Sequence, residues 1–456
     1  MLAKSKLDYF LKIICVTVVC AVLCSCSMTG FNSTDIMRPP KSTGERAEIE
    51  AAIETAVNGD YTLKYPQSGD YRSSVIIFDL DNDSDNEAIA FVSKDTGDAA
   101  GISLLFIDNT ESGYKCINEF TVAAAEVDKV TVIDIDNDGT KELLIGWSVY
   151  SSQIKTLTAY SYNSPAAAQL ICEETYSELV IADIDSDSKD DVLLFSLASA
   201  EKPASAKLIK MSESSTALYS ATTVAMNADA IKYSALSFGK INDNVSGYFI
   251  DAITVDSNTQ TQVIYLDESG SLQNPLFSTD SEAATNPTSR SAPILSSDVN
   301  NDGITEIPIP NRLHSSSLSE NETLCDMYDW CNYNIYSSSL DTAVSAVYDP
   351  NGDYYFKIPE NWEDMFTAVY NSSDNSITFK KLVKEYSSDS VTTSDGEIIL
   401  EIRKFKEDEF SSYSGYTQIK KSSDSVYAYK TYISDSDEFY ISQKNITDSF
   451  ILSDNL

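Results

Sequence analysis

Four segments of the chain repeat one spacing of acidic and amide side chains, and each follows a short apolar run. Position 1 is always Asp, position 3 is Asp or Asn, position 5 is Asp, position 9 is Asp or Glu, and position 6 is Gly or Ser. Side chains at positions 1, 3 and 5 of a tight loop converge, and position 9 can close the cage from the following strand. The spacing therefore predicts a loop that wraps a hard cation.

We call these segments the Asp79, Asp134, Asp183 and Asp298 ladders, after their first residues. Calcium is the expected ion, at about four sites, because it takes roughly six to eight oxygen ligands in irregular geometry, whereas magnesium requires a stricter octahedron. Position 7 is expected to offer its backbone carbonyl. The predicted ligands at positions 1, 3, 5, 7 and 9 are Asp79, Asp81, Asp83, Asp85 and Glu87; Asp134, Asp136, Asp138, Thr140 and Glu142; Asp183, Asp185, Asp187, Lys189 and Asp191; and Asp298, Asn300, Asp302, Ile304 and Glu306.

The residues around the ladders exclude calcium loops of the EF-hand type. An EF-hand needs a bidentate Glu at position 12 and a helix on each side. Position 12 is apolar in all four ladders, and the flanks are β-branched runs typical of strands, such as 130–133 and 178–182. Asp, Asn, Ser and Gly also favour ordinary turns, so the alternative that some loops bind metal weakly or not at all stays open.

The distances between the ladders predict the architecture. The ladders begin at residues 79, 134, 183 and 298, and the last gap is about twice the others, so a fifth unit is expected near residue 240. Residues 238–245 lie in the right register but have lost most of the carboxylates, which indicates a degenerate repeat near Gly239 that kept its strand and lost the ion. Such a period, with several short strands per unit, predicts β-propeller blades.

The predicted fold is therefore mainly β, a β-propeller of about five blades with calcium loops, followed by a small α+β domain. Strands are expected at 88–92, 102–107 and 114–120 in the first unit, and at 142–150, 154–162 and 166–172 in the second. The expected organisation is a signal segment at 1–26, a flexible stalk at 27–42, a short helix at 43–58, propeller repeats at 59–342 and the C-terminal α+β domain at 343–456.

A strand, then Asp-x-Asp-x-Asp-Gly-x-x-Glu, then a second strand, repeated at this spacing, resembles the FG-GAP/VCBS repeats of integrin-α-like β-propellers. The resemblance covers roughly residues 60–340 and implies calcium-binding blades. Ser84 and Ser188 depart from the family by replacing the loop glycine, and five units are countable where seven blades are common, so five, six or seven blades stay open. The stretch 61–66 is expected to supply a closing strand to the last blade.

The N-terminus predicts the compartment. Lys4, Lys6 and Lys12 form a basic n-region, and the apolar run at 11–23 is too short for a permanent membrane span. The run ends in Leu23-Cys24-Ser25-Cys26, which resembles a bacterial lipobox and implies acylation of Cys26. An ordinary secretory signal is the alternative. The chain is thus expected at the cell surface, anchored by lipid alone to the outer face of a bacterial membrane.

Charge and composition limit which partners the chain can bind and which reactions it can catalyse. The net charge of −38 argues against nucleic acid as a partner. Cys325 and Cys331 lie close enough in sequence for a possible disulfide, although connectivity cannot be deduced from sequence. The only histidine, His314, lies in a serine-rich stretch, and the chain has no nucleophile elbow and no His-Glu-x-x-His motif. No catalytic residue is predicted.

The two segments outside the repeats have their own signatures. Ser42-Thr43-Gly44-Glu45 is a capping-box pattern that leads into a helix with Ile49, Ile53 and Val57 on one face. Beyond residue 343, an aromatic strand and the Pro359-x-x-Trp362 turn resemble small α+β domains of the PsbP-like kind. Residues 439–451 are a possible final helix.

The predicted function is a surface-anchored, calcium-binding module that binds an extracellular protein or glycan. One alternative is a surface enzyme, or an accessory subunit of one, acting on polysaccharide. It would need two carboxylates about 5–10 Å apart in a cleft, neither of them a calcium ligand. The other alternative is a structural component of a cell-envelope assembly, which would self-associate without a soluble ligand.

Overall fold

The computed structural model describes residues 44–94, 101–135, 138–149, 152–162, 168–185, 190–212, 217–277, 286–316, 318–362, 364–386 and 391–453. These residues form a mainly β fold, as predicted, with antiparallel strands grouped into six sheets. The expected signal segment and stalk lie outside the described residues. In the part of the chain that the structure describes, no helix has the length and apolar character needed to cross a membrane.

Five sheets follow one another along the chain, and we call them the first to fifth sheets. The first contains β1 (Tyr61–Lys64), β2 (Val75–Phe78), β3 (Glu87–Lys94), β4 (Ile102–Thr110) and β5 (Gly113–Val122). The second contains β6 (Glu126–Ile133), β7 (Glu142–Ser148), β8 (Lys155–Ser161) and β9 (Gln169–Tyr176). The third contains β10 (Glu178–Ala182), β11 (Asp191–Ser196), β12 (Ser205–Met211) and β13 (Leu218–Ala225).

The fourth and fifth sheets complete this series. The fourth contains β14 (Ala230–Lys240), β15 (Ser246–Thr254), β16 (Thr259–Leu266) and β17 (Leu272–Gln273). The fifth contains β18 (Ile307–Asn311), β20 (Asp326–Asn334), β21 (Ser339–Tyr348), β22 (Tyr354–Lys357) and β28 (Phe450–Leu452). The strands expected at 102–107 and 114–120 lie within β4 and β5, and the degenerate repeat kept both of its strands, β14 and β15.

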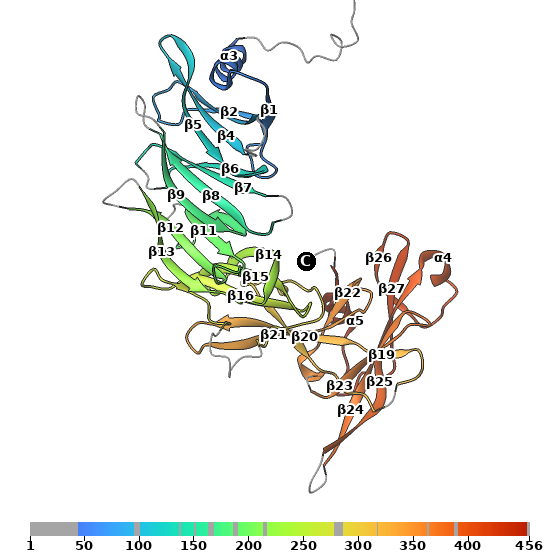
Figure 1. Ribbon diagram of the computed structural model, residues 1–456. Coiled ribbons are helices and arrows are strands. Elements are labelled where there is room, and N and C mark those ends of the chain that lie inside the picture. Colours follow the sequence, from blue (N-terminus) through green and yellow to red (C-terminus); the bar gives the residue numbers. More distant parts are fainter. Residues whose placement is uncertain are drawn as a thin grey trace, which may run out of the picture.

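Neighbouring sheets pack face to face, and their second strands are buried on both faces. In β7, Leu143 and Ile145 join the core shared with the first sheet, while Leu144 joins the core shared with the third. Burial on both faces explains why such strands are continuous apolar runs and not alternating ones. The sheets form a row that leads from helix α3 (Glu45–Val57) to β20 and β21 (Figure 1). No closed propeller forms among the described residues.

The outer face of the first sheet is covered by α3. Ile49 and Ile53 are fully buried and pack with Ala88, Ala90 and Leu105 of β3 and β4. The predicted docking face of the helix is therefore confirmed, although the helix starts after Gly44 without a side-chain cap. In a closed ring this sheet face would pack against the last blade. Here a helix occupies it, which explains why the row has an end.

The stretch 61–66 does not close the last blade. Its strand β1 pairs antiparallel with β3 in the first sheet, with Tyr61 opposite Lys94 and Lys64 opposite Phe91. The strand β2 covers only Glu87 to Ala90 of β3, so the rest of β3 has a free edge that β1 pairs with. The prediction of a closing strand was wrong because this nearer edge was available.

A buried ion pair anchors the segment that leads from the fourth sheet to the fifth. Arg290 lies 2.7 Å from Asp251 of β15, and neither side chain is exposed. Arg290 also donates to Thr261 Oγ1 and to the carbonyl of Ile294, and Asp251 accepts from the backbone N–H of Ser296. Both charges are therefore surrounded by hydrogen-bonding groups, which is the condition for burying an ion pair without a large loss of stability.

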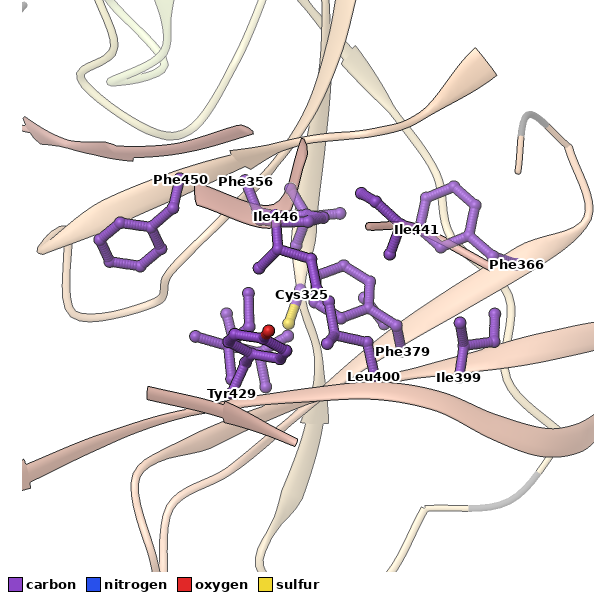
Figure 2. Packing of buried hydrophobic residues seen from close by; sticks show 14 of the residues in the cluster. Cys325, Phe356, Phe366, Phe379, Ile399, Leu400, Tyr429, Ile441, Ile446 and Phe450 are labelled. Carbon is purple, nitrogen blue, oxygen red and sulfur yellow. The ribbon is translucent and has the colours of Figure 1, made fainter. Parts of the chain in front are cut away.

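The last sheet packs on one large core that it shares with the fifth sheet. This C-terminal sheet contains β19 (Glu322–Leu324), β23 (Phe366–Asn371), β24 (Ser376–Tyr386), β25 (Val391–Lys406), β26 (Thr417–Ser422) and β27 (Ser425–Thr431). The core gathers Phe379, Leu400 and Tyr429 from the sheet with Phe356 of the fifth sheet (Figure 2). Trp362 is fully buried beside them and donates from Nε1 to the Phe439 carbonyl at 2.8 Å.

Strand pairing crosses the expected domain boundary at residue 343. Strand β21 spans that position, and β28, near the C-terminus, pairs with β22 in the fifth sheet. Strand β19, which precedes the boundary, pairs with β23 in the C-terminal sheet. Three short helical segments complete the unit, namely η1 (Glu360–Trp362), α4 (Glu407–Phe410) and α5 (Gln443–Ser449). The helix expected at 439–451 is thus limited to α5, because Phe450 already continues as a strand.

The possible disulfide between Cys325 and Cys331 does not form, and both residues are free thiols. Cys325 directly precedes the extended strand β20, and Cys331 lies within it. Six residues of extended strand span about 20 Å, which is too far for a disulfide. Cys325 packs in the C-terminal core, and burial raises the pKa of its thiol. Burial also raises the pKa of Cys331, to about 11. Both thiols therefore stay protonated at neutral pH and act as small apolar side chains.

Candidate metal sites

The Asp79, Asp134 and Asp183 ladders connect β2 to β3, β6 to β7 and β10 to β11, the Asp298 ladder precedes β18, and position 9 closes each loop in the same way. The carboxylate at position 9 accepts a hydrogen bond from the backbone N–H at position 2. The donor–acceptor distances are 2.8 Å for Leu80 to Glu87, 3.0 Å for Ile135 to Glu142, 3.2 Å for Ile184 to Asp191, and 2.9 Å for Val299 to Glu306. One arrangement of the acidic side chains therefore recurs in four places.

Position 1 holds the turn at position 6. The backbone N–H groups of Ser84, Gly139 and Gly303 donate to the carboxylates of Asp79, Asp134 and Asp298, at 3.1, 3.0 and 2.9 Å. These three residues have φ values of 78°, 94° and 89°. Such φ values are strained for a residue with a Cβ. Ser84 therefore adopts the same loop conformation at a higher conformational cost than glycine would. The predicted turn at position 6 is confirmed in these three ladders.

The structure brings position 1 and position 9 together in three ladders. Carboxylate oxygens lie within 4.8 Å of one another in three groups: Asp79, Asp81 and Glu87; Asp183, Asp185 and Asp191; and Asp298, Asp302 and Glu306. Asp83 and Asp85 are exposed and are not part of the first group. Asp136, Asp187 and Lys189 lie outside the described residues.

Burial and neighbouring carboxylates together change the acidity of position 9. The pKa of Glu87 is raised to about 7, mainly by burial and also by the charges of Asp81 and Asp83, against the hydrogen bond from Leu80, which lowers it. Burial likewise raises the pKa of Glu306 to about 7, with Asp302 and Asp298 adding to the effect. Buried carboxylates that repel one another gain most from a cation placed between them.

The donor atoms fit a hard cation. The groups offer carboxylate oxygens with neither imidazole nor thiolate, which is the ligand set of calcium, magnesium or manganese. Asp79 Oδ1 is buried and has no hydrogen-bond partner in the described part of the chain. A buried polar atom of this kind is costly unless something binds it. A bound cation would supply the partner that Asp79 Oδ1 lacks.

Lysines approach two of the ladders, and the sequence analysis did not identify them. Lys210 of β12 lies 3.6 Å from Asp191 and 3.9 Å from Asp185. Lys357 of β22 donates to the Val299 carbonyl of the Asp298 ladder at 2.6 Å. Burial lowers the pKa of Lys357, while Glu306 and Asp298 raise it. Lys210 could have been found from the strand register, whereas Lys357 comes from a strand far along the chain.

The degenerate repeat has a different loop. Gly239 pairs with Gly247 and Lys240 with Ser246, so its hairpin is tighter than the hairpin in which Phe78 pairs with Glu87. The side chain of Asn242 accepts from the backbone N–H groups of Asn244 and Val245, at 2.9 Å each. An amide thus holds this turn where carboxylates hold the others.

A cavity of about 910 Å³ lies between α3 and β5 and is lined by Glu48, Ala52, Tyr114 and Glu119 among others. Burial alone would raise the pKa of Glu119, but hydrogen bonds from Lys94 and Ser103 outweigh it and lower the pKa. An ionised, paired carboxylate is a poor general acid. His314 is an exposed residue far along the chain from this cavity lining.

Comparison with known proteins adds no family. No protein-family model matches the chain, and no curated protein matches its sequence.

Proposed function

We propose that this protein is a calcium-binding β-repeat module of the FG-GAP/VCBS type that binds an extracellular protein or glycan. The observation that carries the proposal is the recurrence of one hydrogen-bonded acidic loop in four repeats. Three of these loops also gather three carboxylates within 4.8 Å of one another. Such crowding is unfavourable unless a cation offsets the repulsion.

The five sheets of the row are the repeat units in this proposal. Each would be one blade, and the fourth would have lost its ion. The five blades of the predicted β-propeller would follow one another along the row. The α3 cap on the first sheet favours an open array of blades over a ring.

The proposed anchoring of the module at the membrane is inferred from the N-terminal sequence. In this proposal Cys26 is acylated and the array is held at the outer face of a bacterial membrane. The variant Cys26→Ala should leave the membrane fraction or fail to mature, and unchanged retention of the variant would contradict the anchor.

Calcium binding can be tested directly on residues 27–456 after removal of metal by a chelator. Titration calorimetry is expected to give dissociation constants on the order of 10⁻⁴ to 10⁻³ M, as in extracellular modules. The variant Asp302→Asn should remove one site. The matched control Asp243→Asn lies in the degenerate repeat and should change nothing. The absence of binding heat, together with a melting temperature indifferent to chelator, would refute the calcium proposal.

The ligand can be sought with the calcium-loaded protein on a glycan array and in pull-down from extracellular material. Calcium stabilises the loops but need not touch the ligand. Binding that persists unchanged after chelation would therefore separate the ligand site from the ladders. Turnover of a polysaccharide by the purified protein would instead support the enzyme alternative.

A further inference from the structure

The cavity between α3 and β5 has two walls that differ in kind. The α3 wall is formed by side chains on successive turns, from Glu48 to Ala56, whereas the β5 wall contains every residue from Gly113 to Glu119. Successive residues of a strand point to opposite faces of the sheet. A lining that includes all of them therefore follows the edge of β5, and not one of its faces.

Strand β5 ends its sheet. It pairs with β4 from Gly113 to Val122, and among the described residues no second strand pairs with its other edge. The backbone N–H and C=O groups on such an edge point sideways and can pair with a further strand. Ile117 is a β-bulge with no partner in β4, so regular pairing is expected along 113–116. One wall of the cavity thus offers a short row of main-chain hydrogen-bonding groups.

The α3 wall leaves room beside that edge because its side chains are small. Ala51, Ala52 and Ala56 line the cavity. Thr55 lies between them, and its hydroxyl already donates to the Ala51 carbonyl at 2.7 Å. The backbone of a bound segment can therefore approach β5 closely, with apolar surface of the helix on its other side.

Hydrogen bonds hold the residues toward both ends of the β5 wall. The Tyr114 hydroxyl donates to Glu45 of α3 at 2.7 Å, and the backbone N–H of Ala168 donates to Asn118 Oδ1 at 2.9 Å. Four steps along a strand span about 13 Å, which matches about four residues of an extended chain. The groove is thus already formed, and a bound segment need not order its walls.

The charge around the cavity is negative. Helix α3 carries four glutamates and one arginine, and Glu48 is an exposed residue of the lining. On the β5 wall Glu119 pairs with Lys94 at 2.6 Å, and Lys115 is the only cation among the described lining residues. Complementary charge favours one class of partner over others. The acidic helix therefore favours a cationic segment.

We propose that this cavity takes an extended, cationic segment of an extracellular partner protein, which pairs with the edge of β5 and packs its side chains against α3. The inference rests on the proposed binding function, names its site, and selects a protein over a glycan as the ligand. In strand addition to an exposed sheet edge, main-chain hydrogen bonds supply affinity and alternate side chains supply specificity. A glycan has no row of amide groups to match the edge.

A thiol of the cavity lining gives a direct readout. Cys116 lines the cavity and is a partly exposed free thiol, whereas Cys172 is a partly exposed free thiol of β9 outside the lining. Cys325 and Cys331 are buried. Burial raises the pKa of both Cys116 and Cys172, so their alkylation by iodoacetamide is compared at one alkaline pH. A segment beside β5 should cover Cys116 and leave Cys172 reactive.

The probe is a synthetic peptide of alternating lysine and valine, added in excess to calcium-loaded protein of residues 27–456. It should suppress alkylation of Cys116 and leave that of Cys172 unchanged. A peptide with proline in place of every valine lacks main-chain donors and should not protect Cys116. Equal protection by the proline peptide would overturn strand addition. No protection by the lysine–valine peptide would overturn the site.

Two variants of α3 separate the cavity from the general negative charge of the chain. Glu48→Lys places a like charge at the cavity and should weaken binding of the lysine–valine peptide by about fivefold. Glu54→Lys is the matched control, because Glu54 is exposed on the same helix but outside the lining, and it should change the affinity little. Equal effects of the two variants would overturn the assignment to the cavity.

Other occupants give other results, each of which overturns the proposal. Faster alkylation of Cys116 in residues 44–456 than in 27–456, without peptide, would identify the protein's own N-terminal segment. Protection that grows with protein concentration would identify a second copy, and protection by a glycan from the array but not by the peptide would identify a glycan site. Capture of a partner protein by the calcium-loaded chain in these cases would leave the proposed function standing, whereas loss of all capture would overturn both.

Discussion

In the row, hydrophobic cores lie between neighbouring sheets, as between the second and third, whereas the C-terminal sheet packs around one large core that it shares with Val347 and Phe356 of the fifth sheet. Leu144 and Leu194, for example, join a core between the second and third sheets. The C-terminal core instead gathers Trp362, Phe379 and Leu400 around one centre. The comparison teaches that a repeat depends on its neighbours and on its loop, while the C-terminal unit depends on its aromatic packing.

The largest expected effect comes from the C-terminal core. Trp362→Ala should destabilise this unit by about 3–5 kcal/mol through lost packing, and the orphaned Phe439 carbonyl should add about 1–3 kcal/mol. Hydrogen exchange should show loss of protection beyond residue 350, with the first to third sheets unchanged. Loss of protection across the whole chain would mean that the two regions unfold as one.

A somewhat smaller effect is expected within the row, at its buried ion pair. Arg290→Met leaves Asp251 buried and unpaired, which should cost about 3–5 kcal/mol. The double variant Arg290→Met/Asp251→Leu should recover most of that loss, because an apolar pair replaces both charges. Urea unfolding of the two variants checks this. A double variant no more stable than the single one would contradict the assigned role of the pair.

Removal of one calcium ligand should act on one repeat alone. Asp138→Ala should abolish the site of the Asp134 ladder, and the loss is about 2.7 kcal/mol at calcium a hundredfold above the dissociation constant. Asp134 and Glu142 then repel each other without their cation. Protection against exchange should fall between about residues 128 and 175 only. A uniform fall, including beyond residue 350, would show that the repeats are not modular.

The smallest expected effect is a gain in stability where the two regions meet. Burial raises the pKa of Asp349 to about 6 from its ordinary 3.8, so the folded protein holds this proton more tightly than the unfolded chain. Its contribution to stability therefore declines as pH rises from about 4 to 6, and the penalty is complete at pH 7. Asp349→Asn should raise the free energy of unfolding by about 1–3 kcal/mol at pH 7. Urea melts at pH 7 and pH 4 check the sign, because the gain should vanish at pH 4.

Local sequence predicted the parts of the structure that depend on local chemistry. The loop shape follows from position 6, where Gly139 and Gly303 adopt positive φ. The strands follow from β-branched runs, and the docking face of α3 follows from the spacing of Ile49 and Ile53. These features are confirmed because each depends on residues a few positions apart.

Features that depend on distant pairing were not predictable. Strand β1 pairs with β3 in the first sheet, although its sequence was equally suited to an edge of the last sheet. Strand β28 pairs with β22, which lies almost a hundred residues earlier in the chain. The position of Lys357 beside the Asp298 ladder depends on that arrangement. A pattern of apolar residues sets which side of a strand is buried but not which strand becomes its neighbour.

The helical cover on the first sheet has a consequence for how such proteins change over generations. A ring must contain the number of blades that completes its circle, so duplication of one blade strains every contact around it. A row whose terminal sheet is sealed by a helix has no such requirement, because each unit contacts only its neighbours. The number of sheets in the row can therefore change during evolution. Relatives of this chain are expected to differ by whole repeats inserted after α3.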